Sequence, residues 1–191
     1  MTSAFLIEAL TPAHWPQLEA LFGDKGACGG CWCMLWRAPY GGARFEADKG
    51  EPNRAKLRAL VESGRVRGSL AFRGDRTIGW VSYGPRSDFP YFERSRALVS
   101  FDGTARWVVT CFYLPAGERG QGVASALLMA AVEAARAAGA PGIEGYPVEA
   151  KGKRVSAAFA WTGVPALFVR AGFRELRHPI SQRIVCRLDF A

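Results

Sequence analysis

One junction constrains the fold of this chain more than any other part of its sequence. The apolar run WVVTCFYL at 107–114 has the length and the β-branched and aromatic content of a buried strand. Two glycines, Gly120 and Gly122, follow within a short loop. The residues from Val123 to about Ala138 then show the apolar spacing of an amphipathic helix. The sequence therefore predicts a buried strand that leads through a glycine loop into a helix.

Such a junction can bind an anion. A helix N-terminus presents unpaired backbone N–H groups and a partial positive charge, and small residues let a phosphate approach the backbone. Gly120, Gly122 and Ala124 are small, and Arg119 adds a cation that suits phosphate. Taken alone, the two glycines fit an ordinary turn better than a ligand site, so a ligand has to be argued from the surrounding sequence.

Two common nucleotide-binding motifs fit the junction poorly. The dinucleotide fingerprint GxGxxG needs a third glycine where this chain has Ser125, and it normally lies in the first strand–helix unit. A P-loop needs Gly-Lys followed by Ser or Thr, which the junction lacks.

The rest of the chain alternates predicted strands and helices. Strands are expected at 4–10, 66–73, 78–84, 143–149, 173–178 and 181–190. Helices are expected at 11–23, 52–64 and 164–171, with irregular chain at 26–39 and a long loop at 85–103. This order, with antiparallel hairpins at both ends, predicts an α/β (α+β mixed) fold in which helices flank a mixed sheet.

Composition limits the classes of function. The 191 residues are 49% hydrophobic and 22% charged, which predicts one globular domain over residues 1–191. No apolar run has the length of a membrane span and no secretory signal begins the chain, so we expect a cytoplasmic protein. The formal net charge of +8 favours an anionic ligand, whereas the dispersed arginines argue against nucleic acid.

Three of the five cysteines, Cys28, Cys31 and Cys33, form a CxxCxC pattern. An odd cysteine count without a secretion signal predicts reduced thiols. Thiolates can bind zinc, but structural zinc sites usually have a second paired cluster, which this chain lacks. We therefore expect no metal, and the alternatives for the segment are a pocket wall or packing of cysteine and tryptophan side chains.

The junction and a later segment together resemble a known family. The run from Arg119 to Ala124 resembles the R/Q-x-x-G-x-G/A loop of the GNAT superfamily of N-acetyltransferases. The segment LFVRAGFRE at 167–175 is similar to the L-Y-x-x-x-G-F segment of that family, and CGGCWCMLWR resembles a segment of one bacterial subgroup. The resemblance covers most of 66–190 and implies a strongly bent mixed sheet and transfer of an acetyl group from acetyl-CoA to an amine.

The resemblance also implies how acetyl-CoA would bind. The pyrophosphate would lie on the backbone amides from Gln121 to Ser125, and the pantetheine would pair with strand 107–114 as an added strand. A backbone N–H near Tyr113 or Leu114 would stabilise the oxyanion, in a slot opened where strands 107–114 and 143–149 splay apart. The implied cofactor residues are Phe112, Tyr113, Leu114, Arg119, Gly120, Gln121, Gly122, Val123, Ala124, Ser125 and Phe168.

Two departures from the family pattern affect this expectation. Pro115 lies four residues before Arg119, whereas the family usually has a proline three residues before the arginine. The residues of strand 107–114 that would contact pantetheine are therefore defined only to within about one position. Many members use a tyrosine as general acid at the position of Phe168, and phenylalanine cannot donate a proton. An alternative function is therefore a non-catalytic acyl-CoA-binding regulator or sensor.

Glu144 and Tyr146 are the candidate catalytic residues. They lie two residues apart on a predicted strand and therefore share a face, so Glu144 could accept the amine proton and Tyr146 could protonate the thiolate. The alternative is that both face solvent or bond to neighbouring backbone. Glu118 is a weaker candidate, which we expect to be a solvated loop residue.

The acceptor site is predicted mainly from family position. The segment after the first helix would place Trp32, Trp36 and Arg37 around the acceptor, and Tyr83 would lie at the strand end that faces it. Arg86 is expected to be a solvated loop arginine, with an acidic acceptor as its alternative partner. The expected partner is a small-molecule or peptide amine, without nucleic acid or membrane, and a homodimer is compatible with the sequence.

Overall fold

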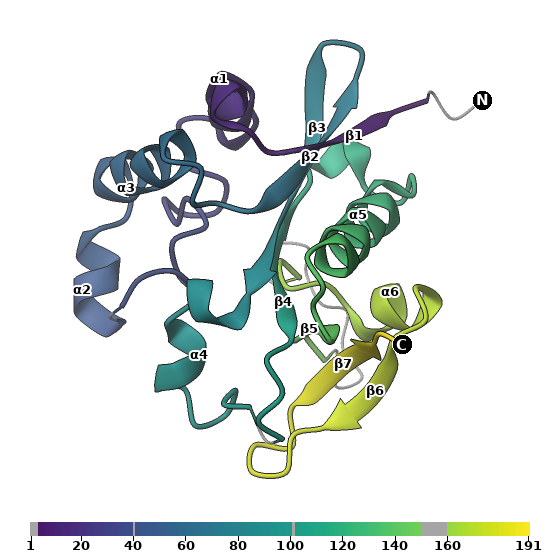
Figure 1. The fold of residues 1–191 in the computed structure, drawn as a ribbon. Coiled ribbons are helices and arrows are strands. Elements are labelled where there is room, and N and C mark those ends of the chain that lie inside the picture. The colour runs from purple at the N-terminus through teal and green to yellow at the C-terminus, as the bar shows by residue number, and fades with distance from the viewer. Residues whose placement is uncertain (1–3, 40, 101, 150–159) are drawn as a thin grey trace.

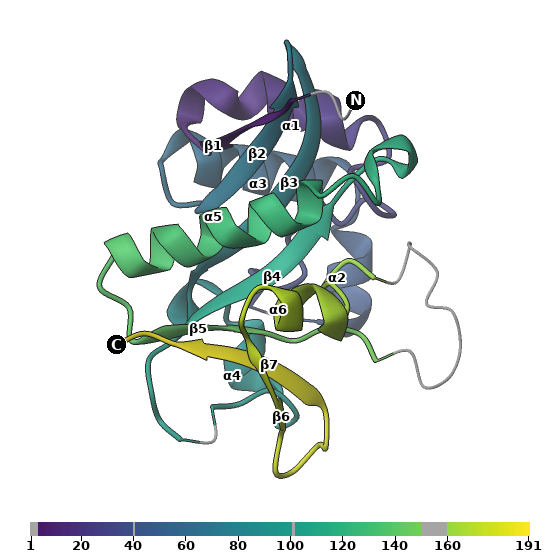
Figure 2. The ribbon, with the colours of Figure 1, turned by 90° about the vertical axis from the view of Figure 1, so that its right-hand side faces the viewer.

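A computed structural model describes residues 4–39, 41–100, 102–149 and 160–191. They form a seven-stranded sheet with strand order β1-β2-β3-β4-β5-β7-β6, and helices cover both of its faces (Figures 1 and 2). The strands are β1 Leu6–Ala9, β2 Gly68–Arg73, β3 Arg76–Pro85, β4 Trp107–Tyr113, β5 Gly142–Gly145, β6 Arg174–Arg177 and β7 Ile184–Asp189. Only β4 and β5 pair in parallel within the described sheet, which confirms the predicted mixed sheet.

The helices divide between the two faces. Helices α1 and α3 lie on one face of the sheet, and α5 and α6 lie on the other (Figure 1). The α-helices are α1 Trp15–Phe22, α2 Gly42–Ala47, α3 Glu51–Glu62, α4 Tyr91–Arg94, α5 Val123–Ala137 and α6 Pro165–Arg170, and the 3-10 helices are η1 Pro12–His14, η2 Arg86–Asp88 and η3 Ala116–Glu118. None of the helices in the described ranges combines the length and apolar character needed to cross a bilayer.

The parallel pair at the centre of the sheet is short. It consists of Trp107 with Ile143, Val108 with Glu144, and Val109 with Gly145, after which β4 continues to Tyr113 paired with β3 only. The two strands therefore part beyond Val109 and Gly145, as the predicted slot requires.

The predicted strand 143–149 is too long, because β5 ends at Gly145. The ring of Phe168 lies against Gly145, so the chain leaves the sheet at this point. The backbone N–H of Val148 then donates to the carbonyl of Gly163 at 3.0 Å, outside the sheet.

Two short helices lie where the sequence predicted no helix. Helix α2 follows the irregular segment, and α4 lies inside the expected loop 85–103. Phe89 and Phe92 of that loop are fully buried. The loop therefore contributes aromatic side chains to the core between the sheet and the cysteine-rich segment.

Candidate functional site

A cavity of about 600 Å³ runs from the opening between β4 and β5 to the N-terminus of α5. Eight of the predicted cofactor residues line it, namely Phe112, Tyr113, Leu114, Arg119, Gly120, Gly122, Ala124 and Ser125. The structure thus brings the strand edge and the glycine loop to one cavity. The other predicted members, Gln121, Val123 and Phe168, do not line it, and Val123 and Phe168 are buried in the core.

The N-terminus of α5 is built to accept an anion. Gly120 has φ +74° and Gly122, the N-cap, has φ +83°, in the left-handed region that other residues adopt at a cost of about 1–2 kcal/mol. The first N–H groups of any α-helix have no intrahelical partner. In this 15-residue helix the N-cap is a glycine, so no N-cap side chain accepts a hydrogen bond from them. They lie beside the cavity together with Arg119.

The edge of β4 beyond its contact with β5 is partly occupied by the chain that precedes α6. The Phe112 N–H donates to the carbonyl of Trp161 at 2.6 Å. Two residues earlier, a β-bulge interrupts the pairing of β4 with β3, because the register passes from Cys111 to Val109 and leaves Thr110 without a partner residue. The bulge lies directly after Val109, the last residue of β4 that pairs with β5.

The extra residue of the glycine loop is taken up by the 3-10 helix η3. Its last residue, Glu118, is buried and forms ion pairs with Arg73 and Arg76 of the β2–β3 hairpin. The expectation of a solvated Glu118 is wrong, since the two arginines draw its carboxylate into the fold. Arg73 also donates to Gln121 Oε1 at 2.9 Å, so the loop is anchored to the hairpin.

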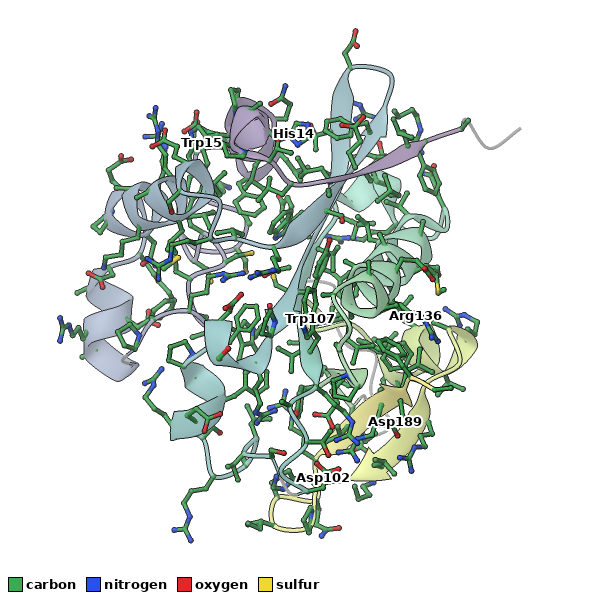
Figure 3. All side chains as sticks on the ribbon, viewed as in Figure 1. His14, Trp15, Asp102, Trp107, Arg136 and Asp189 are labelled. Atoms are coloured by element: carbon green, nitrogen blue, oxygen red, sulfur yellow. The ribbon has the colours of Figure 1, made fainter. Side chains whose placement is uncertain are left out.

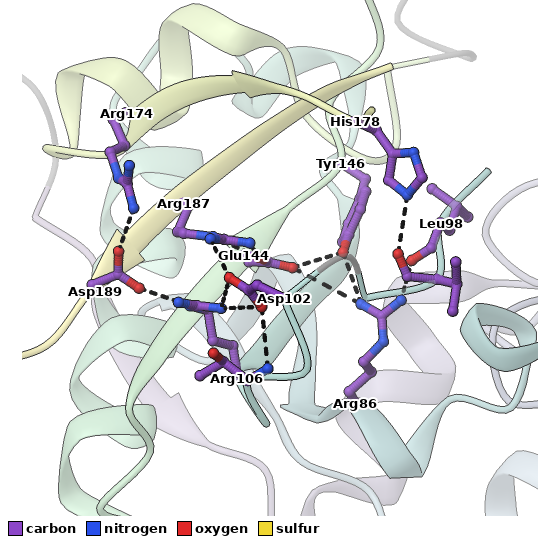
Figure 4. Close-up of polar contacts among 12 residues, drawn as sticks. Arg86, Leu98, Asp102, Arg106, Glu144, Tyr146, Arg174, His178, Arg187 and Asp189 are labelled. Atoms are coloured by element: carbon purple, nitrogen blue, oxygen red, sulfur yellow. Dashed lines mark hydrogen bonds and ion pairs between the residues drawn. The ribbon is translucent and has the colours of Figure 1, made fainter. Parts of the chain in front are cut away.

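Glu144 and Tyr146 come together, as their spacing predicted. The Tyr146 hydroxyl donates to Glu144 Oε2 at 2.7 Å, and both residues are buried (Figure 4). Arg187 donates to Glu144 Oε1 at 2.7 Å, and Arg86 donates to the Tyr146 hydroxyl at 2.8 Å. Burial and the neighbouring Glu144 carboxylate raise the pKa of Tyr146. Neither Glu144 nor Tyr146 lines the 600 Å³ cavity.

Arg86 is not the solvated loop residue that the sequence predicted. Its side chain is 10% exposed, and besides Tyr146 it donates to the carbonyl of Leu98 and lies over the ring of Phe92 at 4.5 Å. The aromatic residues of the loop enclose it, which the sequence alone did not show.

The charged network extends to the far end of the sheet. Arg187 donates to Asp102 Oδ2 at 2.6 Å, and Arg106 bridges Asp102 and Asp189, which lie at the same end of the molecule (Figure 3). Burial alone would raise the pKa of Asp102, but the Thr104 N–H and the two arginines lower it to about 2. The network therefore holds the Asp102 carboxylate ionised.

The predicted acceptor residues are packed inside the protein. Trp32, Trp36 and Tyr83 are each 3% exposed, and the Trp36 ring stacks on Phe92 with centroids 4.9 Å apart. None of the three lines the 600 Å³ cavity, nor does Arg37. Their acceptor role stays a prediction, and the three rings fill three different parts of the core: Trp32 packs beside α1 and α3, Trp36 beside Phe89 and Phe92, and Tyr83 in the cluster that contains α5.

The cysteine-rich segment bends back onto β4. Cys33 Sγ lies 3.4 Å from Cys111 Sγ and accepts from Trp80 Nε1 at 3.3 Å. These two hydrogen bonds lower the pKa of Cys33 despite its burial. No group of three or more potential metal ligands occurs within the described ranges, while Cys28 is exposed and lines the cavity.

The sequence did not identify the far wall of the cavity. Trp161, Gly163, Leu167 and Arg170 form it, at the start of and along α6. Leu167 and Arg170 belong to the segment 167–175, which resembles a segment of the GNAT superfamily. That resemblance was the one sequence feature that could have placed these two residues at the cavity. Arg170 adds a second cation to the cavity, opposite the strand edge.

Comparison with known proteins agrees with this geometry. The profile of the Acetyltransferase (GNAT) family matches residues 31–150. No protein of curated function matches the chain by sequence.

Solved structures with the same fold share little sequence with the chain. The PaiA N-acetyltransferase from Thermoplasma acidophilum, in complex with coenzyme A, is 12% identical with a TM-score of 0.56, over 98% of this chain and 99% of that one. A ribosomal-protein-alanine N-acetyltransferase from Brucella melitensis is 21% identical with a TM-score of 0.56, over 97% and 99%. A putative acetyltransferase from Salmonella typhimurium with acetyl-CoA is 15% identical with a TM-score of 0.54, over 98% and 95%.

These likenesses support the fold, and the family match covers well over half of the chain. The chain belongs to the acetyltransferase (GNAT) family.

Proposed function

We propose that the protein binds acetyl-CoA in the 600 Å³ cavity and transfers its acetyl group to a primary amine. The observation that carries the proposal is the shared cavity of the β4 edge and the α5 N-terminus, beside the point where β4 and β5 part. A helix N-terminus with two left-handed glycines suits a pyrophosphate, and the end of β4, which lines the same cavity, suits the amides of pantetheine. Solved structures of the same fold with coenzyme A or acetyl-CoA support this assignment.

In this proposal the amine attacks the thioester directly. A backbone N–H at the end of β4 stabilises the oxyanion, and the candidates are Tyr113 and Leu114, which both line the cavity. Proton transfer is assigned to Glu144 on β5 and to Tyr146 just after the end of that strand, which are hydrogen-bonded to each other. Arg86 and Arg187 orient this pair.

Binding and turnover test the proposal separately. Calorimetry with coenzyme A should show saturable binding, and Arg119→Gln should weaken it about tenfold, because a charged contact to the pyrophosphate is lost. Arg58→Gln is the matched control, since Arg58 is exposed on α3 and pairs only with Glu62 among the described residues. Release of free thiol from acetyl-CoA over a panel of amines should then identify acceptors. Absence of coenzyme A binding at millimolar concentration would falsify the proposal.

A second candidate is an acyl-CoA-binding protein without catalysis. It is favoured by Phe168, which replaces the tyrosine that the family resemblance implies and is fully buried against Phe112 and Phe173. Saturable coenzyme A binding without thiol release over the amine panel would favour this candidate.

A further inference from the structure

A second pocket, of about 340 Å³, lies between the C-terminal end of α3 and the loop that follows β3. It shares no lining residue with the 600 Å³ cavity. Three arginines and one carboxylate line it, namely Arg37, Arg65, Arg67 and Asp88. The charge of this small pocket is therefore clearly positive.

Arg37 is a buried cation without a close counter-ion. Its residue is 8% exposed, and its single hydrogen bond to the described part of the chain goes from Nη2 to Ser82 Oγ at 3.3 Å. Nε is buried without a partner, and no carboxylate of the described residues lies within 4 Å of the guanidinium. A buried charge without a counter-ion is costly unless a ligand supplies one.

Two further contacts keep the Arg37 guanidinium in place and charged. It lies over the ring of Phe89 at 4.4 Å, which fixes its plane. Burial lowers its pKa to about 10, and Asp88 and Cys33 oppose this effect, so the group is charged at neutral pH. The side chain is thus a positioned donor at the bottom of a pocket.

The single carboxylate of the pocket does not neutralise the site. Asp88 Oδ2 accepts from Arg67 Nη1 at 2.9 Å, so the nearest partner of Asp88 is Arg67. Arg65 is exposed and has no side-chain partner among the described residues. Arg37 and Arg65 are consequently the two cations of the pocket whose charge is left for a ligand.

We propose that this pocket binds a small oxyanion, a carboxylate or a phosphate, between Arg37 and Arg65. The planar fork of a guanidinium matches both groups, and the Ser87 residue at the pocket wall offers a hydroxyl as a further donor. The oxyanion is either the acidic group of the amine acceptor or a separate small anion. The first version rests on the proposed acetyl transfer, whereas binding itself does not.

Calorimetry at low salt tests the site with two probes, inorganic phosphate and succinate. The wild-type protein should bind at least one of them saturably. Arg65→Gln should weaken binding about fivefold, and Asp88→Asn should strengthen it by a similar factor, because it removes the only negative charge of the pocket wall. Arg58→Gln, on α3 and outside the pocket, should leave binding unchanged.

Opposite effects of Arg65→Gln and Asp88→Asn are a readout that a structural role would not give. Arg37→Met should abolish binding. If the Arg37→Met protein does not fold, Arg65→Gln and Asp88→Asn still test the site. Failure of both probes to bind saturably, or equal responses of Arg65→Gln and Arg58→Gln, would overturn the proposal.

Matched amines identify the source of the oxyanion. Acetyl transfer to phosphoethanolamine is compared with transfer to ethanolamine, and transfer to tyrosine with transfer to tyramine. An acceptor that uses the pocket should show a higher kcat/KM than the partner amine that lacks the anionic group. Arg65→Gln should reduce the ratio of the two kcat/KM values about fivefold. If phosphate or succinate binds but Arg65→Gln leaves the kcat/KM ratio unchanged, the pocket binds a separate anion. If a probe binds but no amine is acetylated, the anion site stands and the proposed acetyl transfer fails.

Discussion

The ring of Phe168 lies directly against the backbone of Gly145, so that a Cβ atom at this glycine would be 2.2 Å from the ring. Gly145 is the last residue of β5 that pairs with β4. Because Phe168 belongs to α6, this contact joins the wall of the cavity to the point where the two central strands part. A larger residue at position 145 must move α6 or the strand.

Gly145→Ala should therefore destabilise the protein by about 3 kcal/mol, the upper range for overpacking a core. Gly117→Ala is the matched control, because nothing lies within 4 Å of a Cβ at that glycine, and it should change stability by less than about 0.5 kcal/mol. Urea unfolding of the two variants measures the difference. Equal stability of both would show that α6 yields easily at this contact.

Phe168→Tyr should not restore a catalytic acid. Phe168 is fully buried, and its ring packs edge-on against Phe112 and Phe173, so a hydroxyl added to it would enter apolar surroundings. We expect a loss of about 1–3 kcal/mol in unfolding free energy and no rise in kcat. Chemical denaturation and steady-state thiol release measure the two quantities. A higher kcat in the variant would contradict the placement of this side chain behind the cavity wall.

The sequence predicted those parts of the fold that local patterns determine. The 107–114 strand, the glycine loop and the following helix lie within a residue of their predicted bounds, because apolar periodicity and left-handed glycines act over short distances. The predicted end of β5 was wrong, since it depends on Phe168, which is distant in sequence. Local propensity carries no information about such a contact.

The polar residues show the same limit. The spacing of Glu144 and Tyr146 correctly predicted that they meet, but it did not reveal Arg187, which comes from another strand. Glu118 and Arg86 were predicted to be solvated because both lie in loops, and distant charged or aromatic side chains bury them instead. The partners of a charged group are set by the tertiary fold.

A double-mutant cycle separates the catalytic and structural roles of Glu144. Glu144→Gln and Arg187→Gln each break a buried ion pair, and each should lower the free energy of unfolding by about 3 kcal/mol. The double variant should lose at least about 1 kcal/mol less than the sum of the two single losses. If Glu144 accepts the amine proton, Glu144→Gln should also lower kcat about 100-fold and remove the acid limb of its pH profile. Arg187→Gln keeps the carboxylate and loses only the group that orients it, so it should lower kcat far less than Glu144→Gln does. Equal activity losses in the two variants would assign Glu144 to structure alone.

Asp102 should make stability fall in acid. Its pKa is about 2 in the folded protein and close to 3.8 when unfolded, so its ion pairs with Arg106 and Arg187 stabilise the fold above about pH 4 and are lost as the pH falls through about 2. With allowance for solvent screening of a side chain that is 31% exposed, this contribution is about 1–2 kcal/mol. Asp102→Asn should lower the free energy of unfolding by that amount at pH 7 and flatten its decline between pH 4 and pH 2. Asp75→Asn, at an exposed turn residue, is the control and should leave the decline unchanged. A decline that stays as steep in Asp102→Asn as in the wild type would place the acid sensitivity in other carboxylates.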